Sequence, residues 1–234
     1  MQKAHTKGED LSIRPFEIAH RDVLKIAIPM MIAYLSTPLV GLVATGVIAH
    51  MGRESLVGGV ALAAVVFDVI FVTFNFLRAA TTGFTAQALG ANDRVGEQRM
   101  LASGLIIALV AGLLLLLLQG PIASLGLAAM GARGEVADAA ATYFHWRIWS
   151  APFVLFNFVA FGWIIGRGEA LWSMVLQTLL NGLNAGLSYY WVIGLGWGVE
   201  GVAIASLVAE AVTAMAGLLL ILKKRIPPHG VYRI

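Results

Sequence analysis

Hydrophobic residues occur in long runs along this sequence, and polar residues gather between the runs. Four runs contain no Asp, Glu, Lys or Arg, and they cover residues 26–49, 101–132, 148–166 and 170–199. Two more runs, residues 56–77 and 201–222, contain one acid each. A transmembrane helix needs about 20 mostly apolar residues. The pattern therefore predicts six transmembrane helices, near residues 26–49, 56–79, 101–119, 146–166, 171–194 and 200–222.

The composition agrees with a helical membrane protein. Hydrophobic residues make up 59% of the chain and charged residues 12%, whereas a soluble domain has about 25% charged residues. The strands of a membrane barrel alternate in polarity over about ten residues, but the leucine run at residues 113–118 does not alternate. The sequence therefore predicts an all-α membrane protein.

The basic residues predict the orientation in the membrane. If the N-terminus is cytoplasmic, twelve of the 16 Lys and Arg residues fall in segments on that side. The positive-inside rule then places both termini in the cytoplasm, and it explains the basic pI of about 9.4 without a nucleic-acid partner. The predicted parts are a cytoplasmic N-terminal segment (1–22), a six-helix transmembrane region (23–225) and a cytoplasmic tail (226–234).

Three local features refine this prediction. Pro38 lies in the middle of the first helix, where a proline removes a backbone hydrogen bond and kinks the helix. Arg78 lies at the predicted cytoplasmic end of the second helix, and we expect its long side chain to snorkel toward the interface. Residues 122–145 form the longest outside connection, with room for a short helix.

Two acids inside the hydrophobic runs are the most unusual polar residues of the chain. Asp68 and Glu210 each lie nine residues after the glycine of a Gly-Val-Ala triplet, at Gly59 and Gly201. An acid at membrane depth costs about 2.5–3.5 kcal/mol on insertion scales, so it usually lines a cavity or carries protons. The two segments look like copies of each other, and internal repeats are common in secondary transporters.

A polar stripe follows the fifth helix and consists of Gln177, Asn181, Asn184 and Ser188. Their spacing places the four side chains within about 60° of one another around the helix. Amides in hydrocarbon need hydrogen-bond partners, so this face points into the protein or into a watery cavity. Two interpretations stay open, because the stripe either bonds a neighbouring helix or lines a transport cavity.

Other polar residues share helix faces with the two acids. Asn75 lies seven residues after Asp68, and Ser206 lies four residues before Glu210. Burial favours the neutral form of a carboxyl group, so either acid is a candidate proton carrier. The structural alternative is an acid that only hydrogen-bonds a neighbouring helix. Arg147, near the outer end of the fourth helix, is either a partner for an acid or an interfacial anchor.

The sequence contains no signature of catalysis or metal binding. It has no cysteine, and its five histidines lack the spacing of metal ligands. We find no phosphate loop, nucleophile elbow or zinc motif. The sequence therefore predicts a protein that is not an enzyme and has no cofactor or metal.

Several short motifs resemble one transporter family. The most specific covers residues 76–88 and reads FLRAATTGFTAQA. The others are IPM at 28–30, TPLVGLV at 37–43, GGVA at 58–61, RIWSAP at 147–152, GW at 162–163 and GVAIA at 201–205. In these motifs the chain resembles the N-terminal half of multidrug and toxin extrusion (MATE) transporters, in the DNA-damage-inducible (DinF) branch, over residues 23–222.

The resemblance implies an efflux antiporter of the bacterial inner membrane, coupled to protons or sodium. Its expected substrates are small organic molecules, often cationic or amphipathic. Members of the family have two six-helix lobes facing each other across a cavity, and this sequence provides one lobe. We therefore expect half of a truncated transporter, whose partner is a second lobe or, because both termini lie on one side, a second copy of the chain. The alternative is a non-transporting subunit, or a degenerate lobe that needs a partner.

The sequence departs from the family at the coupling site. The resemblance implies an aspartate on the first helix and another on the fifth, with an asparagine and a hydroxyl nearby. The two aspartate positions hold Ala44 and Ser188 here, whereas Asn184 and Ser206 match the other two. Neither Ala nor Ser carries a proton at neutral pH or a full negative charge.

Asp68 and Glu210 are then the remaining acids at membrane depth. The predicted proton- or cation-coupling candidates are Asp68, Glu210, Asn184, Ser206 and Ser188. The predicted cavity-lining residues are Gln177, Asn181, Asn75, Pro38 and Arg78.

Overall fold

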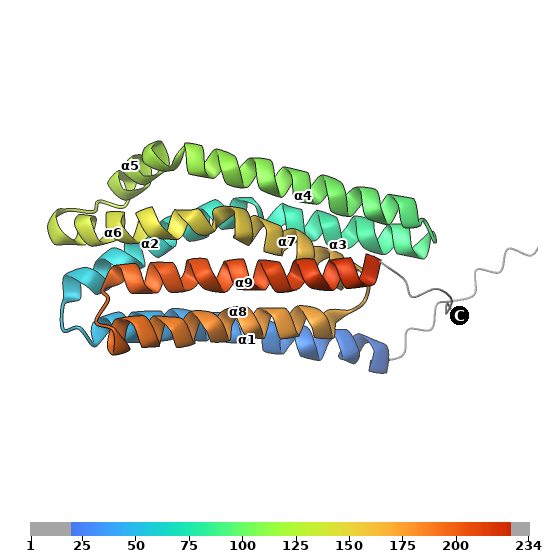
Figure 1. The fold of residues 1–234 in the computed structure, drawn as a ribbon, viewed down its shortest axis with the longest axis horizontal. Helices are drawn as coiled ribbons and strands as arrows, with labels where there is room; N and C mark the ends of the chain where they lie inside the picture. Colours follow the sequence, from blue (N-terminus) through green and yellow to red (C-terminus); the bar gives the residue numbers. More distant parts are fainter. Residues whose placement is uncertain (1–19, 226–234) are drawn as a thin grey trace, which may run out of the picture.

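In a computed structural model, the protein is a bundle of long helices, and the structure describes residues 20–225 (Figure 1). All regular elements within that range are helical. They are α1 (His20–Ala49), α2 (Glu54–Thr73), α3 (Asn75–Gly90), α4 (Arg94–Leu117), α5 (Gln119–Ala129), α6 (Gly134–Arg147), η1 (Ile148–Ser150), α7 (Ala151–Gly166), α8 (Ala170–Tyr189), η2 (Tyr190–Gly194) and α9 (Val199–Arg225). Most of segment 1–22 and all of 226–234 lie outside this range.

Helices lie over all six predicted spans, as the hydrophobic runs indicate. Four helical segments are long and apolar enough to cross a membrane, namely Glu54–Gly90, Arg94–Leu117, Gly134–Gly166 and Val199–Lys224. α1 and α8 lie over the other two predicted spans. The prediction of an all-α membrane protein is therefore confirmed, whereas the count of six membrane crossings stays a prediction.

The second predicted helix is longer than expected. α2 and α3 are separated only by Phe74, and together they continue to Gly90. The predicted end near residue 79 is wrong because α3 carries threonines such as Thr81 and Thr85, which lower the hydropathy although they are buried. Arg78 therefore lies in the first turn of α3, and the prediction that it snorkels from a helix end is wrong.

Two other predicted boundaries also move. α4 begins at Arg94, because the side chain of Asp93 caps the helix by accepting a hydrogen bond of 2.8 Å from the backbone N–H of Gly96. α6, η1 and α7 form one helical segment from Gly134 to Gly166. The region 122–145 thus contains most of α5 and most of α6, instead of a connection with one short helix.

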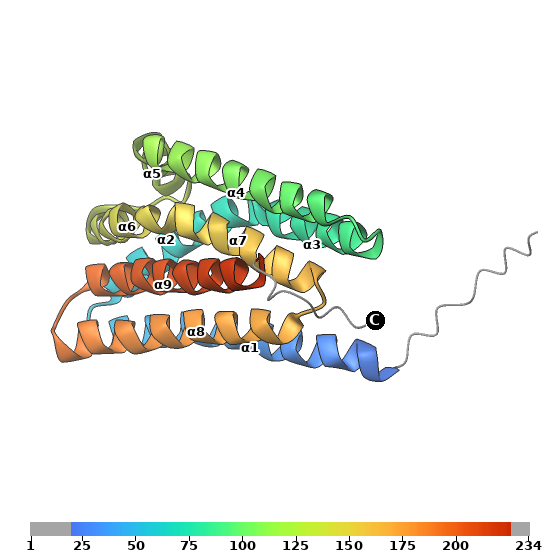
Figure 2. The same cartoon turned by 45° about the vertical axis from the view of Figure 1, so that its right-hand side comes forward.

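The helices are arranged so that α4 lies at one edge of the bundle and α1 with α8 at the other (Figures 1 and 2). α1 packs against α8, α3 against α7, α2 against α6, and α9 against α6, α7 and α8. The start of α1 and the end of α9 lie at the same end of the bundle, beside the α3–α4 and α7–α8 turns (Figure 1). The assignment of this end to the cytoplasm stays a prediction.

Glycines let α3 and α7 pack with their backbones in contact. Gly162 and Gly166 on α7 are four residues apart, the spacing of the Gly-xxx-Gly motif of membrane helices. A Cβ atom added at Gly162 would lie 2.6 Å from the carbonyl oxygen of Arg78, and one at Gly166 would lie 2.6 Å from that of Thr82. This close crossing holds Arg78 beside α7, with its guanidinium 5.5 Å from the ring centroid of Phe161.

Candidate functional site

A cavity of about 620 Å³ lies roughly halfway along the helices and is lined from α1, α2, α3, α6, α7, α8 and α9. Its polar lining residues are Thr45, Asp68, Arg78, Tyr143, Arg147, Asn157, Gln177, Asn181, Asn184, Ser206 and Glu210. Apolar and aromatic side chains line the rest, including Phe71, Phe158 and Phe161. An apolar cavity with a few converging polar groups is the usual form of a small-molecule site.

The two acids of the repeated segments meet in this cavity. Gly59 on α2 and Gly201 on α9 begin the two Gly-Val-Ala triplets, and the helical turns that follow bring Asp68 and Glu210 to the same lining. Gly59 has a packing role as well, because a Cβ atom there would lie 2.5 Å from the Cβ of Ala139 on α6. The repeat noticed in the sequence thus converges on one site.

Glu210 is the buried acid of the pair. Its exposed fraction is 8%, and its Oε2 accepts a hydrogen bond of 2.7 Å from Nδ2 of Asn157 on α7. The same Nδ2 also donates to the backbone carbonyl of Glu210, at 3.2 Å. Asn157 is only 2% exposed, and its Oδ1 has no hydrogen-bond partner among the described residues. A buried carboxyl and an amide therefore form one unit across the α7–α9 contact.

Asp68 has a different environment. Its side chain is exposed to the cavity, and it accepts no hydrogen bond within residues 20–225. Arg147, at the end of α6, lines the same cavity and carries the charge opposite to that of Asp68 and Glu210.

Arg147 is held in place by its other contacts. Its guanidinium lies 5.6 Å from the ring centroid of Phe67 and 5.7 Å from that of Phe71. It also donates a hydrogen bond to Oγ of Ser150. Cation–π contacts of this kind stabilise a charge away from water. The two roles considered for Arg147, partner of an acid or interfacial anchor, both stay predictions.

The polar stripe of α8 faces the cavity along most of its length. Gln177, Asn181 and Asn184 line it, and Gln177 donates to Asn181 Oδ1 at 3.3 Å. Asn184 Nδ2 donates to Oγ of Ser206 on α9 at 2.8 Å. The structure therefore combines the two open interpretations, because the stripe lines a cavity and also bonds a neighbouring helix.

Some predicted site residues lie elsewhere. Ser188, the fourth member of the stripe, is fully buried and does not line the cavity, and its Oγ lies 3.5 Å from Oδ1 of Asn184. Asn75 is exposed and also does not line it, because the break at Phe74 changes the helical phase between Asp68 and Asn75. The side chain of Pro38 lies outside the described part of the chain, although α1 runs through it.

The four positions that the resemblance assigns to a coupling site lie in or beside this cavity. Ala44 on α1 lines it, and Ser188 on α8 packs directly behind Asn184. Asn184 and Ser206 hydrogen-bond each other. The described site there offers neutral oxygens alone.

The sequence pattern missed two functional candidates. Asn157 is the one amide in the charge-free run 148–166, and its isolation in an apolar segment was a usable signal. Tyr143 lines the cavity from α6, but it precedes the predicted fourth helix and carried no signal. Arg78, predicted to line the cavity, does line it.

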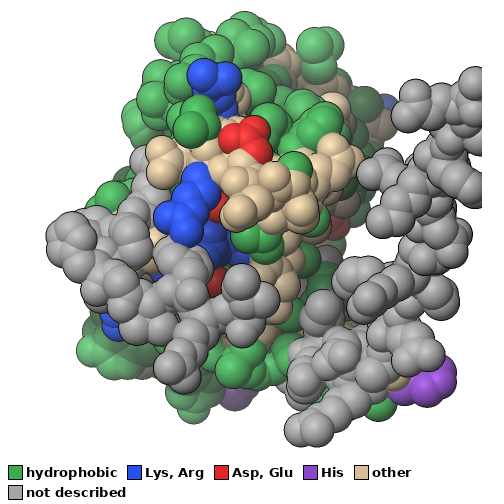
Figure 3. Space-filling model, turned by 90° about the vertical axis from the view of Figure 1, so that its right-hand side faces the viewer, with side chains coloured by type: hydrophobic (Ala, Val, Ile, Leu, Met, Phe, Trp, Pro, Cys, Tyr) green, Lys and Arg blue, Asp and Glu red, His purple; other side chains and the backbone are tan. Residues whose placement is uncertain are grey.

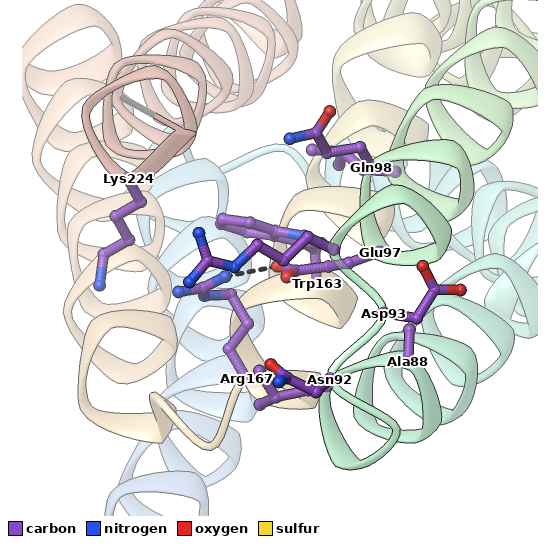
Figure 4. Close-up of a pocket in the computed structure, with 11 residues that line it drawn as sticks. Ala88, Asn92, Asp93, Glu97, Gln98, Trp163, Arg167 and Lys224 are labelled. Carbon is purple, nitrogen blue, oxygen red and sulfur yellow. Dashed lines mark hydrogen bonds and ion pairs between the residues drawn. The ribbon is translucent and has the colours of Figure 1, made fainter. Parts of the chain in front are cut away.

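A second cavity, of about 260 Å³, lies at the end of the bundle that holds the α3–α4 turn (Figure 4). Arg167 donates to Glu97 on α4 and, at 3.2 Å from its Nε, to Glu169. Lys224 at the end of α9 also donates to Glu169. We call these four side chains the Glu97 network, and Figure 3 shows Lys and Arg beside acidic side chains at this end.

The Glu97 network joins the ends of α4, α7 and α9. The Arg167 guanidinium also lies 4.7 Å from the ring centroid of Trp163, which lines the same cavity (Figure 4). Two cations and two acids balance each other, so the arrangement is that of a packing contact between helix ends. Within the described residues no cluster of His, Cys, Asp and Glu has the composition of a metal site.

The chain is similar to known membrane transporters. Residues 29–190 match the family model described as MatE. DNA damage-inducible protein F of Escherichia coli (strain K12) is 39% identical over 198 residues, which are 85% of this chain and 43% of that protein. Multidrug export protein MepA of Staphylococcus aureus (strain NCTC 8325 / PS 47) is 22% identical over 201 residues, which are 86% of this chain and 45% of that protein.

Solved structures give the same result. An outward-facing multidrug resistance MATE family transporter of the MOP superfamily matches with a TM-score of 0.81 and 30% identity, covering 88% of this chain and 45% of that chain. A MOP superfamily transporter from Pyrococcus furiosus matches with a TM-score of 0.80 and 30% identity over the same shares. The chain thus spans about half the length of the relatives that it matches.

Proposed function

This chain belongs to the MatE family, and from that premise we propose that it forms one lobe of a proton- or sodium-coupled efflux antiporter for small organic molecules. It is a multi-pass protein of the bacterial inner membrane. The proposed activity is transport, without catalysis, cofactor or metal. The proposal extends to this chain what the names of its relatives say about multidrug export.

The observation that carries the proposal is the cavity of about 620 Å³, whose lining holds two acids and two arginines within the hydrophobic helices. An ionisable group at this depth is expensive, so it usually serves transport or proton relay. Aromatic walls from Phe71, Phe158 and Phe161 suit an apolar substrate body, and the amides of α8 suit polar substituents.

Coupling is proposed to depend on the acids that remain. Asp68 and Glu210 are the carboxylates that line the cavity among the described residues. Sodium prefers several hard oxygen ligands, usually with a carboxylate among them. The Asn184–Ser206 pair supplies neutral oxygens, so we propose that protons acting on Asp68 or Glu210 are the coupling ions.

The proposed partner is a second six-helix lobe facing the cavity. The share of its relatives that the chain spans, about half, supports this part of the proposal. The same observation favours a second candidate function, a lobe that binds substrate and transports nothing until its partner is present.

The test uses inverted membrane vesicles that contain the full chain and are acidified inside. Added ethidium, an amphipathic organic cation, should release protons, as measured by recovery of a pH-sensitive dye. The matched control is Asp138→Asn, which removes an exposed acid outside the cavity and should exchange like the unmodified chain.

The other outcomes of the vesicle assay decide between the proton-coupled antiporter and the lobe that needs a partner. Exchange driven equally well by a sodium gradient would refute proton coupling. Exchange that appears only after a second six-helix lobe is co-expressed would support the dependent lobe. No exchange under either condition would refute the antiporter.

A further inference from the structure

We infer that the two acids of the cavity have separate tasks: Glu210 carries the coupling proton, Asp68 meets a cationic substrate, and Arg147 makes the two events exclude each other. This inference rests on the proposed function and assigns residues to its steps. The three side chains differ in burial and in hydrogen bonding.

Glu210 suits a proton better than a substrate. It is 8% exposed, and its carboxylate is bonded to Asn157 at 2.7 Å, so little of it is available to a bulky ligand. Asp68 is exposed to the cavity beside Phe71. A carboxylate next to an aromatic wall is the usual recognition site for an organic ammonium or phosphonium group.

Arg147 shares the cavity with both acids. Its guanidinium contacts Phe67, Phe71 and Ser150. When Glu210 is ionised, the positive charge of Arg147 is shared between two negative charges. When Glu210 is protonated, Arg147 compensates Asp68 alone.

The charge count then gives the coupling. With Glu210 ionised, the charges of Asp68, Glu210, Arg147 and Arg78 sum to zero, and a monovalent cation beside Asp68 makes the cavity positive by one. A proton that forms the O–H bond on Glu210 raises the charge of the cavity by the same amount, so the proton and the cation repel each other and each weakens the binding of the other. Such coupling is reciprocal, so a bound cation weakens proton binding to the same extent.

Asn157 allows Glu210 to exist in both protonation states. Its Nδ2 donates to the ionised carboxylate. Its Oδ1 is buried and has no partner among residues 20–225, so a turn of the amide group would let it accept the O–H of the neutral acid. A buried amide with one bonded and one unbonded end is therefore suited to position a carboxyl that changes charge.

Two further charged or titratable groups line the cavity around Glu210. They are Tyr143 of α6 and Arg78 of α3, and the Arg78 guanidinium is the second positive charge in this count. α7 and α8 contribute amides and no charge to the described lining. The proton-dependent charge of the cavity thus comes from Asp68 and Glu210.

The test is equilibrium binding of tetraphenylphosphonium to the purified full chain in detergent micelles, in mildly acidic and mildly alkaline buffer. The unmodified chain should bind more tightly in alkaline buffer, because Glu210 is then ionised. Asp68→Asn should weaken binding about tenfold or more in both buffers, as expected when a charged partner is lost. Glu210→Gln should give the weak binding of the acidic condition in both buffers, with no pH dependence.

Matched probes and variants control for shape and charge. Tetraphenylborate has the same shape and the opposite charge, and its binding should not strengthen in alkaline buffer. Asp138→Asn and Glu200→Gln change the net charge equally but lie outside the cavity, so both should behave like the unmodified chain.

Three results would overturn the inference. They are unchanged binding in Asp68→Asn, full pH dependence in Glu210→Gln, and absence of tetraphenylphosphonium binding at either pH. The vesicle assay decides the antiporter independently. Exchange in vesicles combined with any of these results would leave the proposed function standing and remove the division of tasks.

Discussion

Asn157 on α7 donates a hydrogen bond of 2.7 Å to the carboxylate of Glu210 on α9, and both side chains are more than nine-tenths buried. The amide also bonds the backbone carbonyl of Glu210 at 3.2 Å, so one side chain fixes both the helix and its acid. The contact ties the α7–α9 packing to the charge in the cavity. It therefore offers a direct measurement of how the site and the fold depend on each other.

The first prediction concerns this contact. Asn157→Ala leaves a buried carboxylate without its donor and should lower the free energy of unfolding by about 1.5–3 kcal/mol, the usual contribution of a hydrogen bond to a charged group. Unfolding in mixed detergent micelles measures the change. The matched control, Asn75→Ala, removes an exposed amide and should shift stability by no more than about 0.5 kcal/mol. Equal effects of the two variants would contradict the prediction.

The second prediction concerns the Glu97 network. Glu97 is 8% exposed, so Arg167→Gln leaves a buried acid without its cation and should cost about 3 kcal/mol of stability. Adding Glu97→Gln should recover part of that loss, because the neutral pair no longer contains an uncompensated charge. Arg99→Gln, at an exposed position of the same helix as Glu97, is the control. A double variant less stable than Arg167→Gln would refute the account.

The third prediction concerns the α3–α7 crossing. Gly162→Ala places a Cβ atom 2.6 Å from the carbonyl oxygen of Arg78, so the helices must separate at a cost of about 1–3 kcal/mol. Gly83→Ala is the matched control, since nothing lies within 4 Å of a Cβ atom there and alanine favours the helix by up to about 1 kcal/mol. Thermal unfolding should move in opposite directions for the two variants. If Gly162→Ala does not change thermal unfolding, the backbones of α3 and α7 are not in close contact at this crossing.

The fourth prediction concerns the positions of the missing acids. The unmodified chain should show little response to sodium, because Ala44, Ser188, Asn184 and Ser206 offer at most neutral oxygens. The double variant Ala44→Asp with Ser188→Asp should gain a sodium-dependent change in tryptophan fluorescence, with Trp191 three residues from Ser188. Potassium is the ionic control. The isosteric pair Ala44→Asn with Ser188→Asn should not respond.

A strong sodium response of the unmodified chain would contradict the fourth prediction. It would show that the neutral oxygens of Asn184 and Ser206 bind cations without a carboxylate. The proton-based coupling at Asp68 and Glu210 would then need to be reconsidered.

Much of the fold was predictable because hydropathy reports membrane helices directly. The run around residues 200–222 became α9 with small changes at its ends, and the run around 101–119 became most of α4, which begins earlier, at Arg94. The error at the second helix has a physical cause, since hydropathy averages side chains without regard to where they face. Thr81 and Thr85 are polar by composition, yet they are buried against α7.

The candidate site was predictable by residue type and only partly by position. The spacing of Gln177, Asn181 and Asn184 placed them on one face, and the structure puts that face on a cavity. The same spacing included Ser188, which is buried behind the lining. Periodicity predicts which residues share one face of a helix. Which of those residues a neighbouring helix buries depends on the packing of the bundle.

The sequence by itself determined that this is a helical membrane protein of the MATE type and that its two acids repeat after the same triplet. These properties depend on residue type and local spacing. The tertiary structure alone decided that Asp68, Glu210 and Arg147 share one cavity and that Asn157 bonds Glu210. These relationships join residues on different helices, and only the packing of α2, α6, α7 and α9 brings them together.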